Sequence, residues 1–277
     1  MKTYRYWAKA AAENQPAGKL VECFGCSNES VQAALADAQV RANKISDAMQ
    51  SGSVSDQYSY GKRPVREEIV EDFEHDNRLV AVITRNTYGA LVLNTPRTLF
   101  ADIDYREEPM SVGGLISSLF GKRKPSQDEQ VIARIEELVA QDGSLGVRVY
   151  RTKNGFRCLV KSRTYDPLSE ESHRLLRQLE SDPKYVQLCQ VQECYRARIS
   201  PKPWRCGLDT PPARFPFRDD QIERVYREWQ SAYEERAKSY CACALIGDFG
   251  AADVHPEVDL VMQLHDHFAC ADDRPLC

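Results

Sequence analysis

Two aspartates, Asp102 and Asp104, are separated by one residue at the end of an apolar run. Alternate residues of a strand face the same side, so both carboxylates are expected on one face, with Leu99, Ala101 and Ile103 on the other. Adjacent anions repel each other, so this arrangement is favourable mainly when a divalent cation or a cationic partner lies between them. We therefore expect Asp102 and Asp104 to bind Mg²⁺ or Mn²⁺.

A basic hairpin follows, with six basic residues and no acidic residue from Gly146 to Arg163. Asn154-Gly155 predicts its turn, and pairing about that turn places Thr152 opposite Arg157, on the face of the aspartates. A guanidinium beside a metal would bind a triphosphate, which is the combination that phosphoryl transfer requires. The alternative is a surface hairpin with solvated charges. The predicted phosphate-binding residues here are Arg151, Thr152, Lys153 and Arg157.

A second basic segment, residues 194–206, contains two prolines and one tryptophan. Cationic and aromatic side chains interleaved in this way suit phosphate binding combined with base stacking. Trp204 is the best stacking candidate, and Lys202 and Arg205 beside it are the predicted phosphate ligands. In the alternative interpretation Trp204 fills the edge of the core and the basic residues pair with nearby carboxylates.

The strand before Asp104 and the hairpin around Gly155 resemble two motifs of the archaeo-eukaryotic primase superfamily, the primase-polymerases. In that family a D-x-D pair precedes a hairpin with a histidine on its second strand, and a third carboxylate follows. The resemblance covers roughly residues 90–165. It implies that Asp102, Asp104 and a later acid, Asp248, hold two metal ions. Arg157 stands where the family has histidine, and it would hold the incoming nucleotide.

This resemblance implies template-linked nucleotidyl transfer, with a nucleoside triphosphate or nucleic acid as partner. The catalytic residues would be Asp102, Asp104 and Arg157. An arginine binds phosphate but does not titrate near neutral pH as an imidazole does. The alternative is therefore a catalytically inactive module, similar to an RNA-recognition module, that binds nucleic acid or protein through the same face.

The elements that position these residues follow a β, α, β, β, α order from Leu99 onward. Strands are expected at 99–104, 147–152 and 156–162, and Ser126 to Glu129 is a capping box that begins the intervening helix. Ser169 and Asp182-Pro183 begin two further helices. The fold class is therefore α/β (α+β), with a ferredoxin-like or RRM-like split βαβ core whose open sheet face bears the aspartates. A last strand is expected at 195–200.

Composition divides the chain into three parts. Residues 1–50 are expected to form a β-β-α module, with its helix beginning near Ser27 or Asn28, and residues 51–65 have the composition of a linker. Residues 66–277 would form the primase-like core and a C-terminal helical region, which includes a helix after Asp219 with an aromatic, core-facing stripe. We interpret residues 106–125 as a mobile or partner-facing insertion, and thus a candidate site for a protein partner.

The overall composition is that of a soluble globular protein of 277 residues with 42% hydrophobic content. The net charge of -4 gives no global attraction to nucleic acid, so any such contact must come from a local patch. The chain has neither a signal-peptide core nor the run of about 18 apolar residues that a membrane span needs. We therefore expect a cytoplasmic protein with no membrane partner.

The ten cysteines are scattered along the chain, and reduced thiols are expected. Cys23 and Cys26 have zinc-knuckle spacing, but no second such pair follows, so structural Zn²⁺ is not expected. His265 and His267, with His255 and Cys270 nearby, form another candidate for a transition metal. On a helix His265 and His267 would point about 200 degrees apart, which disfavours joint binding of one ion.

Overall fold

The computed structural model describes residues 1–14, 19–51, 64–105, 125–271 and 273–277. These residues form an α+β protein with six α-helices and three antiparallel sheets. Most of the linker and insertion predicted from composition, at 51–65 and 106–125, lies outside the described residues. Among the described residues, no helix is both long and apolar enough to cross a membrane.

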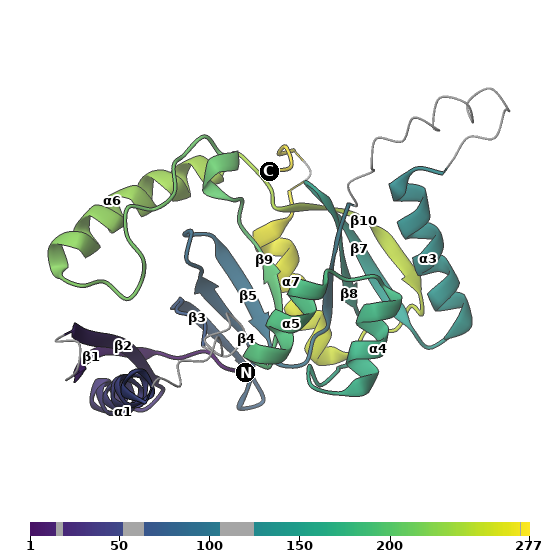
Figure 1. Ribbon diagram of the computed structural model, residues 1–277. Helices are drawn as coiled ribbons and strands as arrows, with labels where there is room; N and C mark the ends of the chain where they lie inside the picture. The colour runs from purple at the N-terminus through teal and green to yellow at the C-terminus, as the bar shows by residue number, and fades with distance from the viewer. Residues whose placement is uncertain (15–18, 52–63, 106–124, 272) are drawn as a thin grey trace, which may run out of the picture.

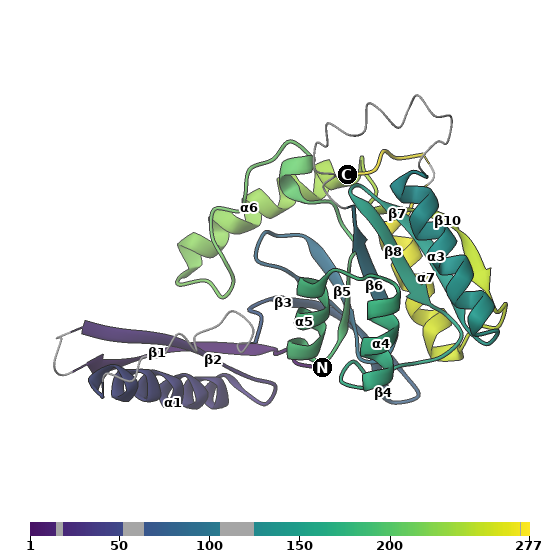
Figure 2. The same cartoon turned by 45° about the vertical axis from the view of Figure 1, so that its right-hand side comes forward.

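The predicted N-terminal β-β-α elements are present. Strands β1 (Tyr6–Asn14) and β2 (Lys19–Ser27) form a hairpin, and α1 (Val31–Gln50) packs on it. The helix begins later than predicted, because the Ser30 side chain accepts from the Ala33 backbone N–H and caps it. Figures 1 and 2 show these elements on one side of the rest of the molecule.

The first four-stranded sheet has the order β3-β4-β5-β9. Its strands are β3 (Glu68–His75), β4 (Arg78–Arg85), β5 (Leu91–Thr95) and β9 (Tyr195–Arg198). A ferredoxin-like core would place the strand expected at 195–200 in the sheet that bears the aspartates. That placement was wrong, because β9 pairs with β5 through partners such as Val92 and Arg198.

The second four-stranded sheet, with the order β10-β7-β8-β6, bears the aspartates. Its strands are β6 (Phe100–Asp104), β7 (Gly146–Thr152), β8 (Gly155–Val160) and β10 (Cys243–Gly250). Helix α3 (Gln127–Gln141) links β6 to β7, and β8 lies between those two strands. The predicted capping box from Ser126 to Glu129 is present. The fourth strand of this sheet is β10, which pairs with β7.

The hairpin register differs from the prediction by two residues. Thr152 pairs with Gly155 and Tyr150 with Arg157, so the turn consists of Lys153 and Asn154. Gly155 is a strand residue, and a Cβ there would lie 2.0 Å from the Ile103 carbonyl oxygen. A glycine is therefore needed at this position so that β6 can approach β8 closely. This requirement places Gly155 in the strand, although Asn-Gly by itself favours a turn.

Helix α7 (Pro256–Ala269) covers the sheet face that we expected to be open. The His265 ring lies 4.5 Å from the Tyr150 ring and 5.3 Å from the Phe100 ring, centroid to centroid, and α7 also contacts β4 of the other sheet. Figure 1 shows α7 beside the strands of both sheets. Helix α3 contacts β7 and β10, with Val131 and Ile135 in the core. The open-face prediction was therefore wrong for most of this sheet.

Three more α-helices are α4 (Glu170–Gln178), α5 (Pro183–Gln192) and α6 (Asp220–Ala237), and a short 3-10 helix, η2 (Pro203–Arg205), follows β9. Each of these α-helices begins at its predicted cap, because Ser169, Asp182 and Asp219 accept a backbone N–H. The predicted aromatic stripe of α6 is partly in the core, since Tyr226 and Tyr233 are buried whereas Val225 is exposed.

Candidate functional site

Asp102 and Asp104 lie side by side at the edge of the second sheet, on the face predicted for them. Their cross-strand partners are Arg157 and Gly155 on β8. The other side of β6 contacts the turn between α4 and α5, because the Asp182 backbone N–H donates to the Asp102 carbonyl. This contact adds a third acidic residue, Asp182, next to the pair.

Two basic residues from the segment after β9, Lys202 and Arg205, are close enough for their charges to act on these acids, although the sequence analysis did not place the two segments together. Burial raises the pKa of Asp104, the charges of Asp102 and Asp182 raise it further, and the charges of Lys202 and Arg205 lower it. Conversely, burial lowers the pKa of Lys202, and Asp104 and Asp102 partly offset that effect. Residues distant in sequence thus form one cluster of mixed charge, which we call the acidic edge: Asp102, Asp104, Asp182, Lys202 and Arg205.

The turn of the hairpin also contacts this cluster. With the Asn154 amide oriented so that its oxygen accepts, Arg205 Nη2 donates to it at 3.1 Å. Trp204 is 49% exposed, its ring lies edge-on to Tyr88 at 5.3 Å, and the Lys202 ammonium lies 5.6 Å from its centroid. Trp204 is therefore not enclosed in the core, and its indole is accessible for stacking. The other part of the alternative interpretation, pairing of the basic residues with carboxylates, holds for Arg196, which pairs with the buried Glu67 at 2.7 Å.

Arg157 differs from the prediction because it is buried beneath α7, with its side chain 5% exposed. Its Nη1 donates to the Arg198 carbonyl at 2.9 Å and lies 3.2 Å from His265 Nε2. Its Nη2 lies 4.0 Å from Asp102 Oδ1. Such an enclosed guanidinium has its donors directed at protein groups, so the expectation that it faces an incoming nucleotide is not supported.

The remaining predicted site residues do not join the acidic edge. Arg151 is on the opposite face, where it pairs with Asp128 at 2.7 Å and covers the Phe156 ring. Thr152 lies on β7 and is separated from Asp104 by strand β8. Lys153 is exposed in the turn.

Asp248 lies on β10, at the opposite edge of the sheet from β6. It forms ion pairs with Arg148 at 3.1 Å and Lys161 at 3.6 Å. Two strands separate it from the other acids, so the predicted metal site of Asp102, Asp104 and Asp248 is not assembled.

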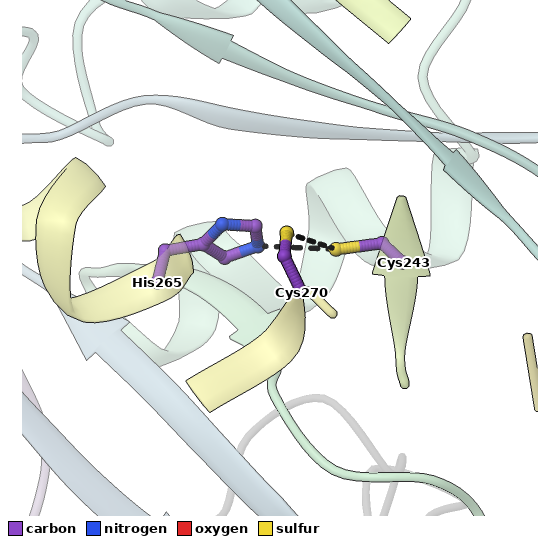
Figure 3. Close-up of side chains that lie close together, drawn as sticks. All are labelled: Cys243, His265 and Cys270. Carbon is purple, nitrogen blue, oxygen red and sulfur yellow. Dashed lines mark hydrogen bonds between the residues drawn. The ribbon is translucent and has the colours of Figure 1, made fainter. Parts of the chain in front are cut away.

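A second cluster consists of Cys243, His265 and Cys270. The sequence analysis named His265 and Cys270 as metal-ligand candidates, but it paired them with His267 and missed Cys243. Cys243 Sγ lies 3.6 Å from Cys270 Sγ and 3.8 Å from His265 Nε2, as Figure 3 shows. The three potential ligand atoms lie within 4.8 Å of one another. The available signal was the spacing of His265 and Cys270 in one helix, but pairing them with Cys243 requires the contact between β10 and α7.

The electrostatics of this sulfur cluster are set by its own members and by Arg157. The hydrogen bond from Cys270 lowers the pKa of Cys243 despite burial, and His265 and the charge of Arg157 lower it further. The same hydrogen bond raises the pKa of Cys270, and burial raises it further. The cluster therefore favours one thiolate, at Cys243, beside a buried guanidinium.

The other thiol and imidazole candidates are not brought together. Cys23 and Cys26 lie three residues apart on β2, so their side chains point to opposite faces of the strand. His267 is exposed on α7, whereas His265 is completely buried, as their helical spacing predicts.

Comparison with known proteins supplies no relative for this chain. No family model matches it, and neither a curated protein nor a solved structure does. The geometry of the two clusters is therefore the basis for assigning a function.

Proposed function

We propose that the acidic edge binds a phosphorylated ligand, a nucleoside triphosphate or nucleic acid, together with Mg²⁺ or Mn²⁺. Asp102 and Asp104 would hold the cation, Lys202 and Arg205 would contact phosphate oxygens, and Trp204 would stack on a base. The observation that carries this proposal is that Arg205 contacts Asn154, the residue before the cross-strand partner of Asp104, so that its charge and that of Lys202 act on the carboxylates of β6. A bridging metal relieves the repulsion between the carboxylates.

The activity that this arrangement would serve is nucleotidyl transfer of the primase-polymerase type. A hydroxyl oxygen would lose its proton to solvent water and attack the α-phosphorus. The bond from that phosphorus to the β-phosphate oxygen would break, and pyrophosphate would leave with the negative charge. The metal would stabilise that charge, and the two basic side chains would orient the phosphates. In this proposal β6, α3, β7 and β8 form the split βαβ unit of a primase-like core.

Binding without catalysis is the second candidate function, and two observations favour it. Arg157 is enclosed by α7 rather than directed at a phosphate, and Asp248 is too far away to be the third metal ligand. A site with two carboxylates and no titratable imidazole can still hold a cation and a phosphate. The same acidic edge would then serve as a nucleotide- or nucleic-acid-binding surface.

A nucleotide-incorporation assay with Mn²⁺ distinguishes these functions. Asp102→Ala combined with Asp104→Ala should abolish incorporation, whereas Asp248→Ala, the same change at the opposite edge, should leave it intact. Incorporation that survives the double substitution would contradict the assignment of the acids. Salt-sensitive binding of a fluorescent nucleotide without incorporation would identify the binding module, and absence of both activities would overturn the proposal.

A further inference from the structure

The structure points to a second metal site, independent of the acidic edge. We propose that Cys243, His265 and Cys270 bind one Zn²⁺ ion, which links β10 to α7. Among the described residues this is the group of three in which thiol and imidazole atoms converge. Sulfur and imidazole ligands select Zn²⁺ over the hard cations that carboxylates prefer.

The spacing of the three ligand atoms suits tetrahedral coordination. Zinc bonds of about 2.3 Å to sulfur and about 2.0 Å to nitrogen place neighbouring ligand atoms roughly 3.5–3.8 Å apart. Cys243 Sγ lies 3.6 Å from Cys270 Sγ and 3.8 Å from His265 Nε2, and the whole group spans no more than 4.8 Å. Two of the three separations thus already match, and an ion would draw Cys270 and His265 closer together by side-chain rotation.

The surroundings of His265 prepare Nε2 as the metal ligand. Its other nitrogen, Nδ1, lies 3.1 Å from Asp266 Oδ1, and an N–H donated there leaves the lone pair on Nε2. The Tyr150 hydroxyl donates to the same carboxylate oxygen at 2.6 Å, and Arg148 pairs with its other oxygen at 3.0 Å. A carboxylate held in this way fixes the histidine tautomer and ring orientation, as in many zinc proteins.

Arg157 is compatible with a bound ion. Its Nη1 lies 3.2 Å from His265 Nε2, so a metal at Nε2 would redirect this donor, and Cys243 Sγ, 3.8 Å from the same nitrogen, is a nearby acceptor. Two thiolates neutralise Zn²⁺, so the guanidinium would meet a centre without net charge and could donate to sulfur. Three protein ligands leave a fourth position, and Cys270, the less buried cysteine, marks the side from which water can fill it.

A disulfide between Cys243 and Cys270 is the competing use of the same sulfur atoms. The chain contains a matched control, because Cys206 Sγ and Cys277 Sγ are also 3.6 Å apart and buried, but they do not belong to the three-ligand group. Cys206→Ala therefore removes a buried thiol from an equivalent pair without removing a proposed ligand.

The test is metal analysis of the full-length protein purified without chelator, followed by Co²⁺ loading of chelator-stripped protein. We expect about one zinc per chain, sulfur-to-cobalt charge-transfer absorption with tetrahedral d–d bands, and a higher melting temperature when Zn²⁺ is restored. Cys243→Ala, His265→Gln and Cys270→Ala should each remove the cobalt spectrum, whereas Cys206→Ala should retain it.

Wild-type measurements keep the test decisive if the variants fail to fold. Folded, reduced wild-type protein that neither contains zinc nor gives the cobalt spectrum would overturn the proposal. A Cys243–Cys270 disulfide detected by peptide mass spectrometry in metal-free, folded protein would overturn it in favour of redox pairing. A full cobalt spectrum in folded Cys270→Ala would also contradict the assigned ligand set.

Discussion

The acidic edge and the sulfur cluster lie on the same sheet face but differ in ligand chemistry and burial. The first offers carboxylate oxygens at a partly exposed edge, whereas the second offers sulfur and nitrogen under α7, where His265 and Cys243 are fully buried. Exposed oxygen ligands suit cations that retain water and exchange with a substrate, and buried thiolates suit an ion that stabilises the fold. One sheet face can therefore provide both kinds of site, because α7 covers only part of it.

Arg157 is the structural link between the two regions, and its removal should have the largest effect. Arg157→Met keeps much of the side-chain volume but leaves the Arg198 carbonyl without this donor. We expect a loss of about 2–4 kcal/mol in the free energy of unfolding, measured by urea denaturation. The control is Arg205→Met at a half-buried position, with an expected loss below about 1 kcal/mol. Equal losses for the two variants would contradict the buried linking role of Arg157.

Replacing the metal ligands of one region at a time tests whether the two sites bind their ions independently. Asp102→Asn with Asp104→Asn should weaken Mn²⁺ binding by about tenfold or more, because both charged ligands are lost. The zinc content should stay unchanged, and Cys243→Ala should have the opposite pattern. Electron paramagnetic resonance of free Mn²⁺ and elemental analysis give the two values. If one set of substitutions removes both metals from folded protein, the sites are not independent.

Local sequence signals predicted the elements of this fold better than their arrangement. The caps at Ser126, Ser169 and Asp219 and the alternation around Asp102 each depend on a few neighbouring residues, and all were confirmed. The placement of β9 was wrong, because strand order depends on packing between segments distant in sequence. The hairpin register was wrong because contact with β6 decides the position of Gly155.

For the candidate site, the sequence likewise identified individual residues but not which of them are buried or in contact. The composition of residues 201–205 identified Lys202 and Arg205, and the structure brings both near Asp104. Burial of Arg157 was not predictable, because nothing in the hairpin indicates that α7 covers it. Cys243 and His265 are distant in sequence, so no local ligand motif revealed their contact.

Salt dependence tests whether the basic side chains at the acidic edge bind phosphate. Lys202→Gln should reduce the slope of log affinity against log salt concentration by about 0.7 for a single-stranded oligonucleotide, because one phosphate contact is lost. Nitrocellulose filter binding over a salt series measures this slope. Lys153→Gln is the control, since Lys153 lies in the exposed hairpin turn. Equal slopes for the wild type and Lys202→Gln would assign the phosphate contact elsewhere.

The smallest expected effect concerns the cost of keeping Asp104 ionised without a cation. Burial and the charges of Asp102 and Asp182 raise the pKa of Asp104, so the folded state binds its proton more tightly than the unfolded state does. Its ionised form therefore destabilises the fold, and this effect disappears as the pH falls through the raised pKa.

Asp104→Asn should accordingly raise the urea midpoint slightly at neutral pH in the presence of chelator. The gain should shrink as the pH is lowered, because the wild-type carboxyl then becomes neutral as well. Saturating Mn²⁺ should reverse the order, since only the wild type retains the carboxylate ligand. Asp253→Asn, at another exposed aspartate, should show neither the pH trend nor the reversal. A lower midpoint for Asp104→Asn in chelator would mean that its carboxylate is already satisfied by Lys202 and Arg205, which would remove the reason for a cation at this edge.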